Sequence, residues 1–195
     1  MTQVSLVPIL LWVAALACAG VAVWQGPRPI QFSFVVDRLL RYLFFFPLGL
    51  QGLWGFVGHV FFAERVAASI GWATSPFQYE VGVANLGLGL ASLYAAFKGF
   101  EARVAVAIAA ACFLVGAGIG HIRDIVETGN LAPGNAGPIM VTDFLTPIVI
   151  VVLLFFASEK WRPKSAATLA LEVELEVARK AMRDCRDALS KLGRE

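Results

Sequence analysis

The stretch VAVAIAAACFLVGAGIGHI, residues 104–122, decides the fold. It contains no Lys, Arg, Asp or Glu, and its strongly polar side chain, His121, comes close to its end. Because a helix needs about 20 mostly apolar residues to cross a bilayer, this stretch predicts a membrane span. Four further stretches of the same kind predict four more spans, at residues 4–24, 39–63, 81–97 and 139–157.

The composition is typical of an integral membrane protein. Of the 195 residues, 58% are hydrophobic and only 15% are charged, against about 25% charged residues in soluble domains. The net charge of +2 does not favour a nucleic-acid partner. We therefore expect an all-α fold, with a bundle of five transmembrane helices over residues 1–160 in the lipid bilayer and a cytoplasmic helix after it.

The distribution of Lys and Arg predicts the direction of the spans. Cytoplasmic loops retain more of these residues than outer loops do. With five spans, eight of them fall on one side and two on the other. We therefore place the N-terminus outside and the C-terminus in the cytoplasm of a bacterial inner membrane. No Lys or Arg precedes the first stretch, so we expect a retained span rather than a signal peptide. The eight are Arg28, Arg38, Arg41, Lys98, Arg103, Lys160, Arg162 and Lys164, and the two are Arg65 and Arg123.

Residues 165–193 have a more charged composition and an apolar repeat of seven residues. Such a repeat favours a left-handed coiled coil, so it predicts a homo-oligomer joined through this cytoplasmic helix. The alternative is an amphipathic helix that lies on the membrane or packs against its own bundle. The apolar positions assigned to the interface are Leu171, Leu175, Ala178, Met182, Cys185, Leu189 and Leu192.

Small residues recur at helical spacing in three of the predicted spans. In lipid, where helix association depends on packing, such stripes let backbones approach one another. We therefore expect them at helix contacts within the bundle or between copies of the chain. The stripes are Gly49, Gly52, Gly55 and Gly58; Gly87, Ala91 and Ala95; and Ala105, Ala109, Cys112, Gly116 and Gly120.

The two histidines, His59 and His121, lie near the ends of the second and fourth spans, which both face outward in this topology. Ionisable side chains at membrane depth are costly and are therefore functional candidates. Asp124 follows His121 by three residues and shares its helix face, whereas a spacing of five puts Glu64 on a different face from His59. The predicted inward set is His59, Glu80, His121, Asp124 and Asp143, with Glu64 and Asn85 at its margin.

Two imidazoles and several carboxylates from four helices could hold a transition-metal ion, as in di-metal helical bundles. The Glu-x-x-His signature of those bundles is absent, and so are HExxH and paired CxxC motifs. Three interpretations stay open: a network that only pins the bundle, a metal or redox site, and a path for protons, ions or small molecules. The loop at residues 128–138 is rich in turn residues, and we expect it to fold as a lid over the outer end.

Arg41 precedes the Gly-spaced second span, Glu80 with Gly82 opens the third, and Arg103 leads into the Ala-rich fourth. This order of features resembles the DoxX-like family of small bacterial inner-membrane proteins over spans two to four. It is also similar to uncharacterised bacterial membrane proteins with several spans. The DoxX-like resemblance implies a partner in membrane redox chemistry. The first span, the tail and the two histidines depart from the family pattern, so no catalytic role is carried over.

The sequence thus predicts a small oligomeric inner-membrane protein with a polar His/Asp/Glu cluster near its outer face, where metal binding or redox chemistry is the expected function. One alternative is a channel or transporter whose oligomer forms a pore, because the inner halves of the fourth and fifth spans are nearly free of polar side chains. Another is a scaffold that recruits a cytoplasmic partner through its tail. The sequence identifies no catalytic residue, and a transition-metal ion is the one candidate cofactor.

Overall fold

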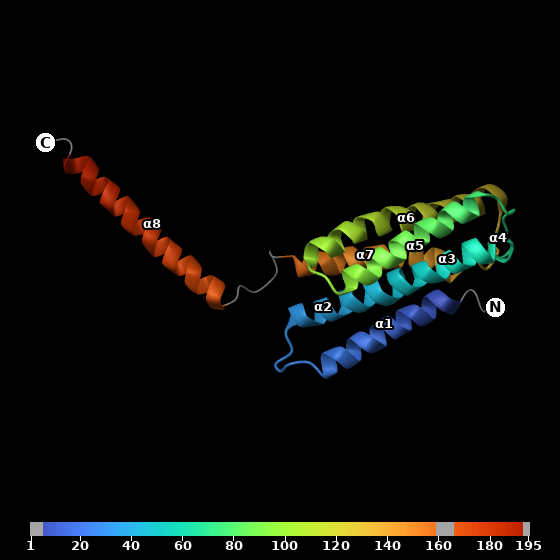
Figure 1. Ribbon diagram of the computed structural model, residues 1–195, viewed down its shortest axis with the longest axis horizontal. Coiled ribbons are helices and arrows are strands. Elements are labelled where there is room, and N and C mark those ends of the chain that lie inside the picture. The colour runs from blue at the N-terminus through green and yellow to red at the C-terminus, as the bar shows by residue number, and fades with distance from the viewer. Residues whose placement is uncertain (1–5, 159–165, 193–195) are drawn as a thin grey trace. The chain divides into compact units, whose positions relative to one another are not determined.

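The computed structural model describes residues 6–158 and 166–192, and over these residues the chain is all-helical. The chain divides into two units, a helix bundle that ends at Trp161 and a tail (Figure 1). The elements of the bundle are α1 (Val7–Trp24), α2 (Phe32–Leu43), η2 (Phe44–Leu50), α3 (Gln51–Phe61), α4 (Ala63–Ile70), α5 (Phe77–Ala96), α6 (Phe100–Thr128) and α7 (Pro138–Ala157), and the tail is α8 (Ala166–Leu192).

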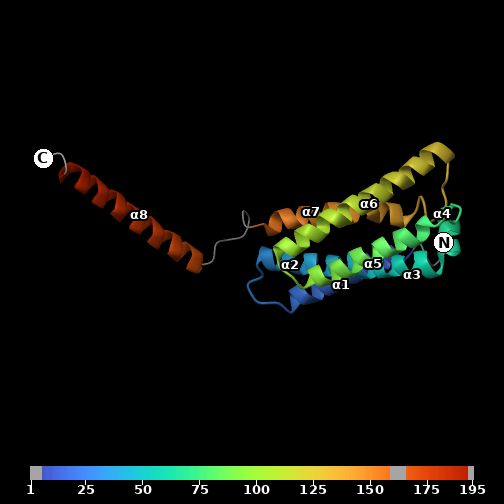
Figure 2. The same cartoon turned by 45° about the horizontal axis from the view of Figure 1, so that its top comes forward.

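The long helices of the bundle run up and down between two ends (Figure 1). At the end that we call the histidine end, α3 and α6 finish, α5 and α7 begin, and α4 closes the turn after α3. At the other end, the arginine end, α5 and α7 finish while α2 and α6 begin. α5 packs on η2 and α3, α6 packs on α7, and α2 packs on α1 and α7. Figure 2 shows α6 diverging from α3 toward the histidine end.

The segment Phe32–Phe61 is continuous, because α2, η2 and α3 follow one another without a break. Pro47 accounts for the π-helical turns of η2, since its nitrogen carries no hydrogen to donate within an α-helical ladder. We predicted a span from about residue 39, and the helix that contains this span begins seven residues earlier. Helix α2 begins at Phe32 because it is amphipathic and buries Val36, Leu40 and Leu43.

The contact between α3 and α5 depends on two glycines that face each other. A Cβ atom on Gly52 would lie 2.8 Å from the backbone oxygen of Asn85 and 2.8 Å from the Cα of Gly89. Gly49 and Gly55 meet the side chains of Leu93 and Asn85 in the same way. The prediction that the glycine stripe of the second span forms a helix contact is therefore confirmed.

The other two stripes form contacts within the bundle only in part: Ala95 is fully buried, but other members are not. A Cβ on Gly87 or on Gly116 would have no neighbour within 4 Å, and Ala105 and Ala109 are exposed. The face of α6 that is buried in the bundle carries Ala107, Ala110 and Gly118 instead. Spacing alone predicted a stripe, but it could not identify which face of α6 meets its neighbours. Contact between copies of the chain through these stripes stays a prediction.

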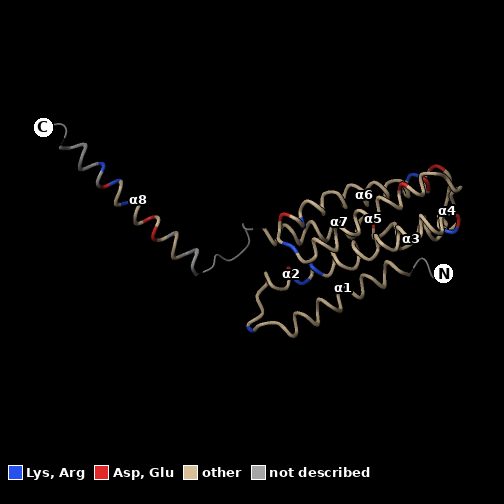
Figure 3. The backbone as a smooth tube through the Cα atoms, in the orientation of Figure 1, with Lys and Arg blue, Asp and Glu red and all other residues tan. Residues whose placement is uncertain are grey.

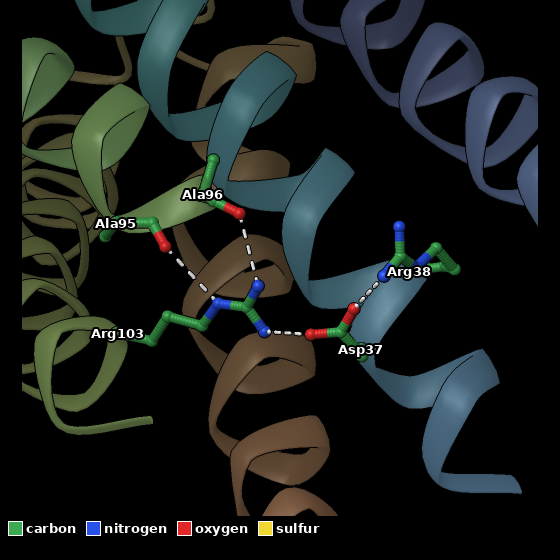
Figure 4. Close-up of polar contacts among 5 residues, drawn as sticks. All are labelled: Asp37, Arg38, Ala95, Ala96 and Arg103. Atoms are coloured by element: carbon green, nitrogen blue, oxygen red, sulfur yellow. Dashed lines mark hydrogen bonds and ion pairs between the residues drawn. The ribbon is translucent and has the colours of Figure 1, made fainter. Parts of the chain in front are cut away.

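The apolar core fills the half of the bundle near the arginine end, where Phe44, Leu40 and Ile150 are almost fully buried. Arg103 lies beside this core and is itself only 6% exposed. Its Nε and one terminal nitrogen donate to the backbone oxygens of Ala95 (3.3 Å) and Ala96 (3.1 Å), at the end of α5. Its other terminal nitrogen donates to Asp37 on α2 at 2.8 Å (Figure 4). One buried cation thus joins three helices, and it shares the carboxylate of Asp37 with Arg38, whose terminal nitrogen lies 2.8 Å from the other carboxylate oxygen (Figure 4).

Several other boundaries also correct the predictions. Helix α4 occupies part of what we predicted as an irregular outer loop. Helix α6 continues to Thr128, beyond the predicted end at residue 122, because the charged residues of its last two turns lie on exposed surface. The fifth predicted span, residues 139–157, matches α7 closely.

Among the described residues, four helical segments are long and apolar enough to cross a membrane: Val7–Trp24, Phe32–Phe61, Phe100–Thr128 and Pro138–Ala157. Helix α5, with 20 residues, is long enough, but its first turns carry Gln78, Glu80 and Asn85. Figure 3 shows that the charged positions of the bundle lie mainly toward its two ends, with basic and acidic positions at both.

Helix α8 forms the tail as one helix of 27 residues, close to the predicted residues 165–193. The described apolar side chains of the predicted seam are exposed, among them Leu171, Leu175 and Met182, which are 66%, 50% and 65% exposed. Ala178 is exposed as well. The side chains of Cys185, Leu189 and Leu192, and the cations Lys160, Arg162 and Lys164, lie outside the described residues.

The close approach of α3 and α5 predicts opposite effects for two similar substitutions. Gly52→Ala pushes backbone against backbone and should destabilise the protein by about 1–3 kcal/mol. Gly87→Ala adds a methyl group in open space and should be neutral or slightly stabilising, because Ala is the better helix former. Thermal unfolding in detergent measures both, and an equal loss of stability in the two variants would contradict the proposed contact.

Arg103 predicts a second pair of contrasting variants. Arg103→Gln leaves the Ala95 and Ala96 oxygens without their donor and should cost about 2–4 kcal/mol in unfolding experiments. Arg123→Gln is the control, because Arg123 pairs with Glu127 on an exposed surface, where ion pairs contribute little. If Arg103→Gln proved as stable as the control, the contacts of Arg103 would not stabilise the packing of α2, α5 and α6.

Candidate functional site

A cavity of about 530 Å³ lies toward the histidine end of the bundle. Its walls come from α3, α4, α5, α6 and α7 and from Trp72 and Gly134 in the two loops. Most of the lining is apolar or aromatic, including Trp54, Val81 and Phe113. Its size and composition are those of a small-molecule site, which needs a few polar groups in a mostly apolar wall. The polar side chains in the wall are Gln51, His59, Ser69, Asn85, Cys112, His121 and Asp143.

His121 is the most firmly held of these side chains. It is 6% exposed, and its Nδ1 lies 2.7 Å from Oδ1 of the fully buried Asn135. The amide of Asn135 is oriented by its own nitrogen, which donates to the backbone oxygen of Asn130 at 2.8 Å. An amide oxygen can only accept, so Nδ1 of His121 must carry the hydrogen. In the neutral ring, Nε2 is then an acceptor, and it is this atom that faces Asp143.

Asp143 is the least satisfied buried group of the site. Its side chain enters the cavity from the second turn of α7 and is 3% exposed. Its Oδ2 has no hydrogen-bond partner in the described part of the chain, and the nearest base is Nε2 of His121 at 3.9 Å. That separation is too long for a hydrogen bond. A buried carboxylate without a donor is strongly destabilising, so this position needs an additional partner.

The loop after α6 holds His121 in place. Asp124 accepts hydrogen bonds from Trp72 Nε1 at 2.8 Å and from Asn130 Nδ2 at 2.6 Å. The ring of Trp72 stacks on the imidazole of His121, with centroids 5.8 Å apart and planes 21° apart. We predicted Asp124 as a partner of His121 on one helix face. In the structure its carboxylate instead accepts hydrogen bonds from Trp72 and Asn130, and it thereby positions Trp72 and the loop.

The same loop packs directly on α4. The backbone nitrogen of Gly134 donates to the backbone oxygen of Ser69 at 2.9 Å, and a Cβ on Gly134 would lie 2.7 Å from that oxygen. Glycine is therefore required at this position. The loop closes over the end of the bundle, as expected of the predicted lid.

His59 lines the cavity from α3 and pairs through its Nδ1 with Oε1 of Gln78, a side chain only 7% exposed. An amide thus orients this imidazole as well, and it leaves the other ring nitrogen free of a protein partner among the described residues. Asn85, which the sequence placed at the margin of the site, also lines the cavity, and its Nδ2 donates to Val81 of its own helix at 2.9 Å.

The structure brings together only part of the predicted metal-ligand set. His59, His121 and Asp143 line the cavity, Asp124 lies behind His121, and the side chain of Glu80 is exposed outside the cavity. Within residues 6–158 and 166–192, no three His, Cys, Asp or Glu side chains are grouped so that they could hold a metal ion. The reason is that two of the predicted carboxylates, Glu80 and Asp124, do not line the cavity that contains the histidines.

Sequence reasoning missed the amides that organise the site. Gln51 lines the cavity about two helical turns before His59 on α3, and its buried Oε1 has no hydrogen-bond partner among the described residues. A single Gln within an apolar span was a usable signal, since polar groups at membrane depth are costly. Asn135 and Gln78 gave no such signal, because amides are common in loops and at helix starts.

A bundle of mostly membrane-length helices is typical of a polytopic membrane protein, and here the bundle contains a cavity toward one end. The model of DUF6790, a family of unknown function, matches residues 5–163, and the chain belongs to this family. The matched region includes all seven helices of the bundle. No curated protein and no solved structure matches the chain. The DoxX-like resemblance stays a prediction.

The tautomer of His121 can be measured directly, because the chain contains only two histidines. In ¹⁵N-histidine spectra of the protein in lipid nanodiscs, we expect both rings to carry a hydrogen on Nδ1. His59→Gln assigns the two signals, and Asn135→Leu should abolish the preference at His121 alone. A hydrogen on Nε2 of His121 in the unaltered protein would contradict the assignment of this atom as an acceptor.

Proposed function

We propose that the protein is a five-span membrane protein that binds a small, largely apolar molecule in the cavity at the histidine end. The observation that carries this proposal is Asp143 Oδ2, a buried acceptor that faces the cavity without a donor. A purely structural network would satisfy this atom, because an unpaired buried acceptor costs about 1–3 kcal/mol. A ligand that supplies the missing donor accounts for the arrangement.

Binding is favoured over the alternative functions by the shape of the site. The cavity reaches inward to Gln51 and Cys112, and the tightly packed core around Phe44 and Ile150 lies beyond it. This favours a pocket with one closed end over a pore through the monomer. A metal-binding function has less support, since the imidazoles and carboxylates of the predicted set do not converge.

The direction of α5 supports the fifth span. Helix α3 ends at the histidine end and α6 begins at the arginine end, and α5 runs between them along the bundle (Figure 1). The cation distribution supports the orientation, with Arg28, Arg38, Arg41, Lys98 and Arg103 around the arginine end (Figure 3). We therefore propose that the arginine end faces the cytoplasm of a bacterial inner membrane and that the cavity faces outward.

Two glycines on α6 allow a matched test of the cavity. Neither Gly116 nor Gly120 would bring a Cβ within 4 Å of another group, but only Gly120 lines the cavity. The probes are 1-naphthylmethylamine and the alcohol of the same shape, 1-naphthalenemethanol, in equilibrium dialysis against nanodiscs that hold the full chain. We expect saturable binding of at least one probe, loss of that binding in Gly120→Leu, and no loss in Gly116→Leu. Absence of saturable binding of both probes would refute the proposed function.

We also propose that the tail joins copies of the chain by forming a coiled coil. Leu171, Leu175 and Met182 recur at heptad positions along α8 and are exposed in a single chain. Burying such a seam against another copy would stabilise the helix, since most helical stability in proteins comes from packing of an apolar face.

Changing the seam should change the oligomeric state. Leu171→Glu with Leu175→Glu places charges at two core positions, so the detergent-solubilised protein should shift to monomers in light scattering coupled to size-exclusion chromatography. Val173→Glu with Val177→Glu is the control, since these exposed residues lie outside the a and d positions. If the Leu171→Glu and Leu175→Glu variant still formed oligomers, a coiled coil of the tail would be excluded as the contact between copies.

A further inference from the structure

The acceptors of the cavity indicate what chemical class of ligand it takes, an inference that rests on the proposed function. Asp143 Oδ2 has no donor among the described residues. Nε2 of His121 is an acceptor in the neutral ring, because Nδ1 donates to Asn135. These two atoms face each other across 3.9 Å. With the neutral ring and the carboxylate, these two acceptors repel each other, and a ligand group with two hydrogens to donate would satisfy both of them.

The width of the gap fits a single bridging atom. Hydrogen bonds from nitrogen to oxygen are about 2.7–3.2 Å long. A nitrogen at that distance from both acceptors would span a separation of 3.9 Å with its two N–H bonds pointing apart. A hydroxyl group carries one hydrogen and can satisfy only one of the two acceptors, whereas an ammonium group carries two or three.

The charge of the cavity favours a cation. Among the described residues that line it, Asp143 is the acidic side chain, and no Lys or Arg is present to compensate it. The titratable groups that face the same space are His59, His121 and Cys112. Arg123, the nearest cation along α6, is occupied by Glu127 on exposed surface. A carboxylate that is buried in this way is stabilised most by an opposite charge with hydrogens to donate.

The remaining walls fit the body of such a ligand. Trp54 and Trp72 line the cavity together with aliphatic side chains, and aromatic faces attract cations as well as apolar groups. Deeper in the cavity, Oε1 of Gln51 is a second buried acceptor without a partner. The cavity therefore contains three acceptors, from Asp143, His121 and Gln51, and none of them has a hydrogen-bond donor among the described residues.

We propose that the cavity binds a protonated amine carried on an apolar, aromatic body, with the ammonium group between Asp143 Oδ2 and His121 Nε2. In this arrangement Asn135 is a positioning residue, because it fixes the ring nitrogen that accepts. The ammonium compensates Asp143, and the aromatic body fills the space lined by Trp54 and Trp72. Access from the outer leaflet suits such amphiphilic cations, which partition into membranes.

The test compares the two naphthyl probes in nanodiscs that contain the full chain. 1-Naphthylmethylamine is protonated at pH 7, and 1-naphthalenemethanol has the same shape without the charge and with one hydrogen to donate. We expect the amine to bind at least about tenfold more tightly than the alcohol, because hydrogen bonds to a charged group are the stronger ones. Empty nanodiscs correct for partition of each probe into lipid.

Two carboxylate variants assign the preference to Asp143. Asp143→Asn should bring the affinities for amine and alcohol to within about threefold of each other, since the charge is lost while the shape is kept. Glu80→Gln removes a negative charge from an exposed position on α5, near the same end but outside the cavity, and should leave the preference intact. Unfolding temperatures of both variants show whether each still folds.

The outcomes separate the inference from the proposed function. If the alcohol binds as tightly as the amine, and Gly120→Leu abolishes both, the cavity binds small molecules but the amine assignment is wrong. That comparison needs only the unaltered protein, so it decides even if Asp143→Asn fails to fold. A preference for the amine that survives in Asp143→Asn, or disappears in Glu80→Gln, would also overturn the assignment. If neither probe binds saturably, the proposed function itself fails.

Discussion

A polar group inside an apolar bundle must find a partner, and this requirement governs both ends of the molecule. Arg103 meets it completely, because two backbone oxygens and the carboxylate of Asp37 accept its hydrogen bonds. Asp143 is about as deeply buried, but its Oδ2 has no donor among the described residues. The contrast between these two buried groups is what supports the proposal of a binding site at Asp143. In that proposal the arginine end stabilises the bundle and the histidine end binds the ligand.

The rigidity of the histidine end follows from amides and aromatic stacking rather than from charge pairs. Asn135 fixes the tautomer of His121, Trp72 stacks on its ring, and Asp124 holds Trp72. Each of these contacts comes from a loop or helix end, while the cavity wall comes from long helices. The result is a site whose polar atoms are positioned before a ligand arrives, which lowers the entropy cost of binding.

Most of the helices could be predicted from the sequence, because long apolar stretches have few other stable forms in lipid. The start of α2 could not be predicted, because Asp37 and Arg38 are charged residues at the edge of an apolar stretch. Only the folded structure shows that Asp37 pairs with Arg103 across the bundle. In the site, His59, His121 and Asp143 were predicted correctly as neighbours of one space. Gln78 and Asn135 were not, because the value of an amide depends on which side chain it meets after folding. Glu80 was misplaced for the same reason: a helix start has several faces, and spacing does not decide which one turns inward.

The most direct test of the account is an experimental structure of the full chain in lipid nanodiscs with 1-naphthylmethylamine. The account predicts the ligand nitrogen within about 3.2 Å of both Asp143 Oδ2 and His121 Nε2, with the naphthyl ring in the space lined by Trp54 and Trp72. A cavity filled only by water, with the amine absent or bound elsewhere, would contradict it. So would a His121 ring turned so that its Nε2 no longer faces Asp143.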